Sequence, residues 1–178
     1  MRPLLRAAAL LSLAASALAA QRPDPAPQRA AMERLAYMAG EWEGDGWIRD
    51  AASGRRTTFR GGERVQRKLD GVALLVEGRF TARDSASGAE VPVHVTLGVI
   101  AFDPREARYR FSTWLATGTA GQHVLELDPQ GWHWGFDTPA GKVRYTFVLK
   151  DGTWHEVGDF SRDGTSWERF FEMTLRRK

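Results

Sequence analysis

From Glu41 to the end of the chain, apolar and polar residues alternate in runs of about ten residues, and turn residues separate the runs. Asp-Gly pairs stand at 70–71, 151–152 and 163–164, and Pro-x-Gly triplets stand at 129–131 and 139–141. Such residues between alternating segments are signals for β-hairpins. The pattern therefore predicts about ten antiparallel strands, each joined to the next by a hairpin.

The alternation also indicates which residues share a face of a strand, because side chains in a strand point to opposite faces in turn. Three apolar rows stand out: Val143, Tyr145, Phe147 and Leu149; Val93, Val95, Leu97, Val99 and Ala101; and Trp167, Phe171, Met173 and Leu175. A meander of this kind without long crossovers favours an all-β, closed up-and-down barrel. A two-sheet sandwich is the alternative, but the barrel is favoured because the first and last strands are free to pair.

One helix is expected before the strands. The segment 28–40, "QRAAMERLAYMAG", places Met32, Leu35 and Met38 at helical spacing, and Gly40 suits the C-terminal stop. The preceding segment 20–28, "AQRPDPAPQ", has three prolines and is expected to be an extended linker. Residues 29–178 are therefore expected to form a single barrel domain.

The first nineteen residues have the pattern of a secretory signal peptide. A short basic start with Arg2 and Arg6 precedes an apolar run that is too short to span a bilayer, and the run ends in the small-x-small sequence 17–19. We expect cleavage after Ala19 and a periplasmic or secreted protein without a transmembrane segment.

Charge and cysteine content restrict the function classes further. Removing residues 1–19 leaves 23 basic and 22 acidic residues, a net charge of +1. A net charge this close to zero argues against nucleic-acid binding, which requires clustered positive charge. The chain has no cysteine, so an exported protein must be stabilised by its core and not by disulfides.

A short helical segment followed by Gly40-Glu41-Trp42 at the start of the first strand resembles the calycins, the lipocalin and fatty-acid-binding-protein group of β-barrels. The resemblance implies that Trp42 closes one end of the barrel and that a basic residue at the end of the last strand packs on its ring. Arg176 and Arg177 are the candidates for that residue.

Two further segments, 98–111 ("GVIAFDPREARYRF") and 151–175 ("DGTWHEVGDFSRDGTSWERFFEMTL"), resemble a family of small secreted bacterial proteins with this fold and no settled activity. This resemblance covers most of the chain after the signal peptide. It implies the barrel fold but no particular activity.

Residues for nucleophilic catalysis or metal binding are not evident. The chain has no Gly-x-Ser-x-Gly motif and no cysteine nucleophile. Its histidines, His94, His123, His133 and His155, fall on separate predicted strands. We therefore assign no catalytic residue, metal or cofactor. A haem-binding barrel similar to nitrobindin is an alternative, although the histidine-bearing C-terminal motif of that group has no match in "FFEMTLRRK".

Tyrosine and tryptophan are the more suggestive residues, because their large apolar rings carry one polar group and suit ligand cavities. Trp132, Trp134 and Phe136 fall on one face of a strand, which must therefore be buried. An interior that these rings simply fill is the alternative. The aromatic candidates for ligand binding are Tyr109, Trp114, Trp134 and Tyr145.

Arg169 shares its period-two phase with Trp167 and Phe171, so its guanidinium is expected to point into the barrel, where it needs an anion. Fatty-acid-binding proteins carry an inward Arg-x-Tyr on the last strand, and Arg169-Phe170-Phe171 resembles that pattern with phenylalanine in place of tyrosine. Arg169 is therefore the candidate anchor for an acidic ligand. The alternative is an internal ion pair with Glu156 or Asp159.

The sequence thus predicts an exported barrel that binds a small apolar or amphipathic molecule and performs no chemistry. An isomerase or cyclase that uses the same cavity is an alternative, which paired carboxylates with raised pKa would favour. Glu77, Glu156 and Asp159 are the acids to inspect for it. A structural envelope protein with a filled interior is the third possibility.

Overall fold

The computed structural model describes residues 24–178, so the expected signal peptide and the start of the expected linker lie outside the described residues. Helix α1 (Ala26–Glu33) and the 3-10 helix η1 (Ala36–Met38) come first. The strands are β1 (Gly40–Arg49), β2 (Arg56–Lys68), β3 (Ala73–Arg83), β4 (Glu90–Asp103), β5 (Arg108–Leu115), β6 (Ala120–Asp128), β7 (Gly131–Thr138), β8 (Gly141–Lys150), β9 (Thr153–Ser161) and β10 (Glu168–Arg177), with the 3-10 helix η2 (Leu69–Gly71) between β2 and β3.

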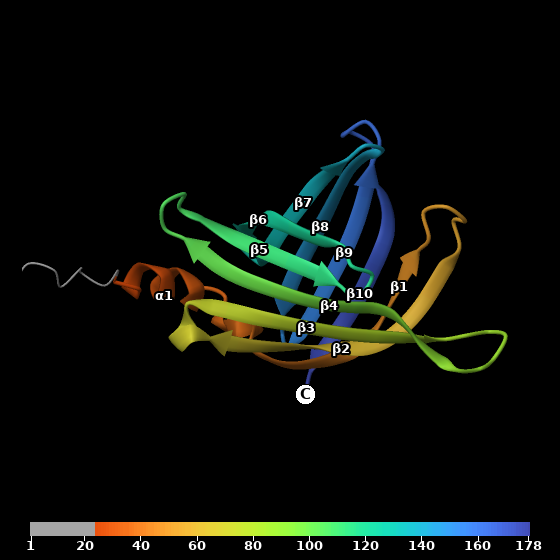
Figure 1. Ribbon diagram of the computed structural model, residues 1–178, viewed down its shortest axis with the longest axis horizontal. Coiled ribbons are helices and arrows are strands. Elements are labelled where there is room, and N and C mark those ends of the chain that lie inside the picture. The colour runs from red at the N-terminus through yellow and green to blue at the C-terminus, as the bar shows by residue number, and fades with distance from the viewer. Residues whose placement is uncertain (1–23) are drawn as a thin grey trace, which may run out of the picture.

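These ten strands form one closed antiparallel barrel. Each strand pairs with the next along the chain, and β1 also pairs with β10, from Trp42 opposite Arg177 to Ile48 opposite Phe171. The expected barrel is confirmed, and the sandwich is excluded because the sheet has no free edge. Figure 1 shows β2, β3 and β4 running roughly along the long axis of the molecule, whereas β7–β10 stand more upright.

The hairpin signals of the sequence correspond to turns between successive strands. Between β8 and β9, Asp151 and Gly152 both have positive φ, 50° and 71°. Positive φ at both central residues matches the right-handed twist of a two-residue hairpin, and Asp-Gly is a preferred pair for it.

The N-terminal segment lies against one end of the barrel, where Figure 1 shows α1 near the ends of β3 and β4. Met32, Leu35 and Met38 are almost completely buried in the core, as their spacing predicts. The helix boundaries differ from the expectation. α1 begins at Ala26, inside the segment expected to be a linker, because a proline is well tolerated at the start of a helix, and the helical segment is interrupted before Ala36.

An irregularity in β10 changes the phase of that strand. Arg169 pairs with Asp159, but Phe171 pairs with Gly158, so Phe170 is the extra residue of a β-bulge. Both Phe170 and Phe171 contact the ring of Tyr145 from the interior. Because the bulge breaks the alternation, Arg169 no longer shares a face with Phe171.

The interior face of β4 also differs from its apolar row. His94, Thr96 and Gly98 line the interior, whereas Leu97 is 38% exposed. Both faces of this strand are partly apolar, so alternation alone does not show which one is inside.

Candidate functional site

A cavity of about 450 Å³ lies inside the barrel. Met38 of η1 and residues from β1 to β10 contribute to its lining, and aromatic side chains predominate on the β5–β8 side. Phe136, which is 39% exposed, and Ala120, which is also exposed, belong to the lining. The cavity therefore reaches the surface beside β6 and β7.

Glycines on the inner face make room for the larger side chains. A Cβ atom on Gly98 would lie 2.6 Å from Cε2 of Phe111, and one on Gly158 would lie 2.9 Å from Cε1 of Tyr145. A Cβ atom on Gly78 would lie 2.5 Å from Oε1 of Glu63. These three positions are too close for any larger residue without movement of the neighbour, so the glycines allow two rings and one carboxyl to occupy the interior.

One continuous row of rings leads from the surface inward. Trp134 stacks on Tyr145 with ring centroids 4.6 Å apart, and it also stacks on Phe136 at 5.9 Å. Deeper in the barrel, Trp132 stacks on Phe147 at 4.6 Å. The indole Nε1 atoms of Trp132 and Trp134 are buried and have no hydrogen-bond partner among the described residues. A buried N–H without a partner is costly, so these two donors are unsatisfied polar groups on residues of the cavity wall.

Trp42 lies at the other end of the barrel. It is 1% exposed, its Nε1 atom donates to the carbonyl oxygen of Met38 at 2.9 Å, and its ring meets that of Trp154 edge-on at 5.6 Å. The guanidinium carbon of Arg177 lies 4.3 Å from its ring centroid. Of the two arginines proposed from the sequence, Arg177 therefore contacts Trp42, whereas Nη1 of Arg176 donates to Thr153 Oγ1 at 3.4 Å.

Two carboxyls line the cavity near this closed end. Glu63 on β2 pairs across the strands with Trp42, and Glu156 on β9 accepts a hydrogen bond from the Trp154 indole at 3.1 Å. Burial raises the pKa of Glu63 well above its usual value, and the nearby charge of Glu156 raises it further. Burial also raises the pKa of Glu156 to about 7, although the Trp154 hydrogen bond opposes this shift.

Three other titratable groups line the cavity. Burial lowers the pKa of His94 and of His123, so both imidazoles are neutral at pH 7. Burial raises the pKa of Tyr145, and the charge of Glu156 adds to the increase. The cavity therefore contains no side chain that is positively charged at neutral pH among the residues that the structure describes.

The structure brings two of the four aromatic candidates, Trp134 and Tyr145, to the cavity wall. Tyr109 is buried outside the cavity, where its hydroxyl donates to the carbonyl oxygen of Ala31 at 2.7 Å and holds α1 against β5. Trp114 is 44% exposed and borders an open depression on the outer side of β2–β5.

The expectation that Arg169 points into the barrel is corrected by the structure. Its Nε atom donates to Oδ1 of Asp159 at 3.0 Å, and its side chain is 41% exposed. Arg144 reaches the other oxygen of Asp159 at 3.5 Å. The β-bulge at Phe170 is the physical reason, because it turns Arg169 away from the row that contains Phe171. The internal pairing with Asp159, which the sequence left open, is the arrangement observed.

The two remaining histidines pair with acids outside the cavity: His133 with Asp128 at 2.9 Å and His155 with Glu172 at 3.1 Å. Within residues 24–178, no three histidine or acidic side chains are grouped so that they could hold a metal ion.

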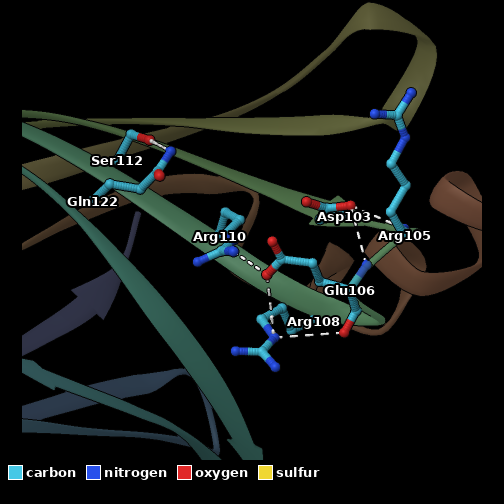
Figure 2. Close-up of polar contacts among 7 residues, drawn as sticks. All are labelled: Asp103, Arg105, Glu106, Arg108, Arg110, Ser112 and Gln122. Atoms are coloured by element: carbon cyan, nitrogen blue, oxygen red, sulfur yellow. Dashed lines mark hydrogen bonds and ion pairs between the residues drawn. The ribbon is translucent and has the colours of Figure 1, made fainter.

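A polar cluster on the outer surface surrounds the β4–β5 turn (Figure 2). The carboxylate of Asp103 accepts from the backbone nitrogen of Arg105 at 2.9 Å, and Glu106 pairs with Arg108 and Arg110. These contacts stabilise the turn, and the Arg105 side chain is exposed to solvent, so the cluster gives no indication of a ligand site.

Glu63 is the important residue that the sequence analysis missed. Its neighbours Arg60 and Arg64 make the segment look like a solvated strand. A signal was nevertheless present, because Glu63 has the same period-two phase as Phe59 and Val65, which are both buried. An acid in the phase of an apolar row must be buried with them.

The described chain is thus a closed ten-stranded antiparallel barrel around a cavity that contains aromatic and acidic side chains. It is similar to the crystal structure of Rv2717c from M. tuberculosis, with a TM-score of 0.59, 11% sequence identity, and coverage of 83% of this chain and 97% of that chain. At this identity the similarity shows the fold alone. Neither a family model nor a curated protein matches the sequence. Among the described helices, none has the length and apolar character to span a membrane.

Proposed function

We propose that this protein binds a small apolar or amphipathic molecule inside the barrel. The observation that supports this proposal is the cavity of about 450 Å³, which falls in the usual size range of ligand sites and is lined with stacked rings. An interior filled by its own side chains would leave no such space.

Native mass spectrometry of the protein purified from its own host tests this function. We expect a retained molecule, and we expect that molecule to quench the fluorescence of the cavity tryptophans when it is added back to the emptied protein. A protein that carries no molecule and shows no quenching with any apolar probe would support a purely structural role instead.

Membership of the calycin-like barrels is part of the proposal. It is supported by Trp42 at the end of the barrel, by Arg177 over its ring, and by the ten strands in simple up-and-down order. Export to the periplasm or the medium is also proposed, and it is supported by the sequence of residues 1–19.

An enzyme that transfers protons in the same cavity is the second candidate. The observation that favours it is the pair Glu63 and Glu156, because buried carboxyls with raised pKa are suited to general acid–base catalysis near neutral pH. The other two acids considered from the sequence do not contribute to it, since Glu77 is exposed and Asp159 is paired with arginines. Exchange of solvent deuterium into the α-position of a cyclic ketone such as tetralone, followed by NMR, tests this candidate.

A further inference from the structure

The cavity contains two carboxyls and no cation to balance them. Among the described residues, only the neutral indole of Trp154 donates to Glu156, and Oε2 of Glu63 has no partner. Neither carboxyl belongs to any ion pair in residues 24–178, and no basic group contributes to the pKa shift of either one. Buried carboxylates in natural proteins are normally paired, so these two carboxyls can ionise at little cost only when a further group supplies a positive charge.

The walls around these carboxyls favour a positive charge. A ring face attracts a cation within about 6 Å of its centroid. Within residues 24–178 this attraction occurs three times with the protein's own arginines, at Trp47, Trp167 and Trp42. None of these three rings lines the cavity. The cavity rings, including Trp134 and Tyr145, have no such arginine in the described part of the chain.

An anionic ligand is disfavoured for the same reasons. With no lysine or arginine in the lining, and with two carboxyls already present, a third carboxylate would be repelled. Arg169, which the sequence suggested as the anchor for an acidic ligand such as a fatty acid, pairs with Asp159 outside the cavity.

We propose that the cavity binds an organic ammonium ion, whose apolar body packs between the cavity rings and whose ammonium group is the counter-ion of Glu63 and Glu156. This inference rests on the proposed function, because it names the chemical class of the ligand that the cavity holds. The ammonium group lies toward the closed end, where both carboxyls are, and the apolar body extends along Trp134 toward Phe136 and the surface.

Binding is coupled to proton release from the protein. Near neutral pH burial keeps a proton on part of the Glu156 population and favours the protonated form of Glu63, because it raises both pKa values, whereas the ammonium ion interacts best with the ionised forms. The remaining titratable groups of the lining, His94, His123 and Tyr145, stay neutral and do not supply the charge. The affinity for an ammonium ion therefore rises with pH through neutrality, and the affinity for a neutral molecule of the same shape does not.

Three probes with one ring system test the inference: naphthylmethylammonium, naphthylmethanol and naphthylacetate. Binding of each is measured by tryptophan quenching and by calorimetry at pH about 7.5, where the amine is protonated. We expect the ammonium probe to bind at least about tenfold more tightly than the alcohol, and the carboxylate to bind more weakly than the alcohol.

Glu63→Gln and Glu156→Gln keep the size of the side chain and remove its charge. Each should reduce the preference for the ammonium probe over the alcohol, and the affinity for the alcohol should be retained. The matched control is Glu77→Gln, which removes an exposed carboxyl from the strand next to β2 and should leave the preference unchanged.

The outcomes separate this inference from the proposed function. An alcohol that binds as tightly as the ammonium probe overturns the inference and leaves a ligand-binding barrel. A preference that survives in both glutamine variants overturns it as well, because the cation then binds elsewhere. If none of the three probes binds, the cavity is not a ligand site and both proposals fail.

A second measurement on the unmodified protein does not depend on the folding of the variants. Calorimetry in two buffers of different ionisation enthalpy, near pH about 7, reports the protons released on binding. We expect release with the ammonium probe and none with the alcohol. Equal heats in the two buffers for the ammonium probe would overturn the inference.

Discussion

The Nε atom of Arg169 donates a hydrogen bond to Oδ1 of Asp159 at 3.0 Å, and this contact lies outside the cavity. Asp159 is 8% exposed and is shared with Arg144, whose guanidinium also lies 4.1 Å from the ring centroid of Trp167. Arg169 is thus one of two cations that neutralise a buried acid on the barrel wall. Its role in the structure is an internal ion pair.

Arg169→Met should therefore reduce the stability of the fold and leave ligand binding unchanged. The variant removes a charged hydrogen bond from a carboxylate that stays buried, and because Arg169 is partly exposed we expect a loss of about 1–2 kcal/mol in the free energy of unfolding. Chemical denaturation measures the loss, and the naphthyl probes measure binding. Arg176→Met, on the same strand, is the control and should be nearly neutral. A weaker affinity for naphthylacetate in Arg169→Met would return this residue to the binding site.

Trp42→Ala should be among the most destabilising substitutions in the chain. The side chain is 1% exposed, packs on Trp154 and donates a hydrogen bond to η1, so its removal leaves a large void and loosens the N-terminal segment. Loss of a buried tryptophan of this kind costs about 3–5 kcal/mol. Trp114→Ala, at a position 44% exposed, is the control and should cost below about 1 kcal/mol. Equal losses for the two variants would mean that Trp42 does not close the barrel.

Much of the fold was predictable because it depends on local signals. Asp-Gly and Pro-x-Gly turns fix where strands end, and they are visible in any single sequence. Closure followed from the simple order of the strands. The position of α1 was predicted less well, since the prolines that suggest a linker are equally compatible with the first turn of a helix.

The site was less predictable because it depends on the phase of individual strands. A single extra residue, Phe170, reverses the orientation of Arg169, and nothing in the local sequence marks the bulge. In β4, Val95 and Leu97 border the outer depression while His94 and Thr96 face the cavity. In a barrel of this kind the interior is partly polar, so the more apolar face of a strand is not always the inner one.

The stability of the empty protein should decrease as the pH rises. Burial raises the pKa of Glu156 from 4.5 to about 7, so between these values the folded state binds more protons than the unfolded chain. The free energy of unfolding therefore falls with increasing pH across this interval. We expect Glu156→Gln to be more stable than the unmodified protein by about 1–3 kcal/mol at pH about 8 and nearly equal to it at pH about 5.

This comparison is made by denaturation of both proteins at each pH. The lowered pKa values of His94 and His123 have the opposite effect, because they make the folded state more stable as the pH rises toward 6.5. This contribution is the same in both proteins and cancels in the comparison. Glu77→Gln is the control and should keep the full pH dependence. A constant difference between Glu156→Gln and the unmodified protein at all pH values would show that Glu156 is ionised in the folded state.

The N-terminus of the exported protein should begin at Ala20 or Gln21. The basic start, the short apolar run and the sequence Ala17-Leu18-Ala19 are the basis of this prediction. N-terminal sequencing of protein recovered from the periplasm or the medium of the host measures it. An intact Met1 on a soluble cytoplasmic product would contradict it.

Gly78→Ala should change the selectivity of the cavity without changing its charge. A Cβ atom at this position lies 2.5 Å from Oε1 of Glu63, so the carboxyl must move away from its place beside Trp42. We expect the preference for naphthylmethylammonium over naphthylmethanol to fall by about threefold to tenfold, since a displaced carboxylate interacts less well with the bound cation. Fluorescence titration with the two probes measures the ratio.

Gly98→Ala is the control on the adjacent strand, because its Cβ atom meets the ring of Phe111 at 2.6 Å instead of a carboxyl. That variant should weaken both probes together and leave their ratio unchanged. Equal effects of the two substitutions on the ratio would indicate that Glu63 does not contact the bound cation.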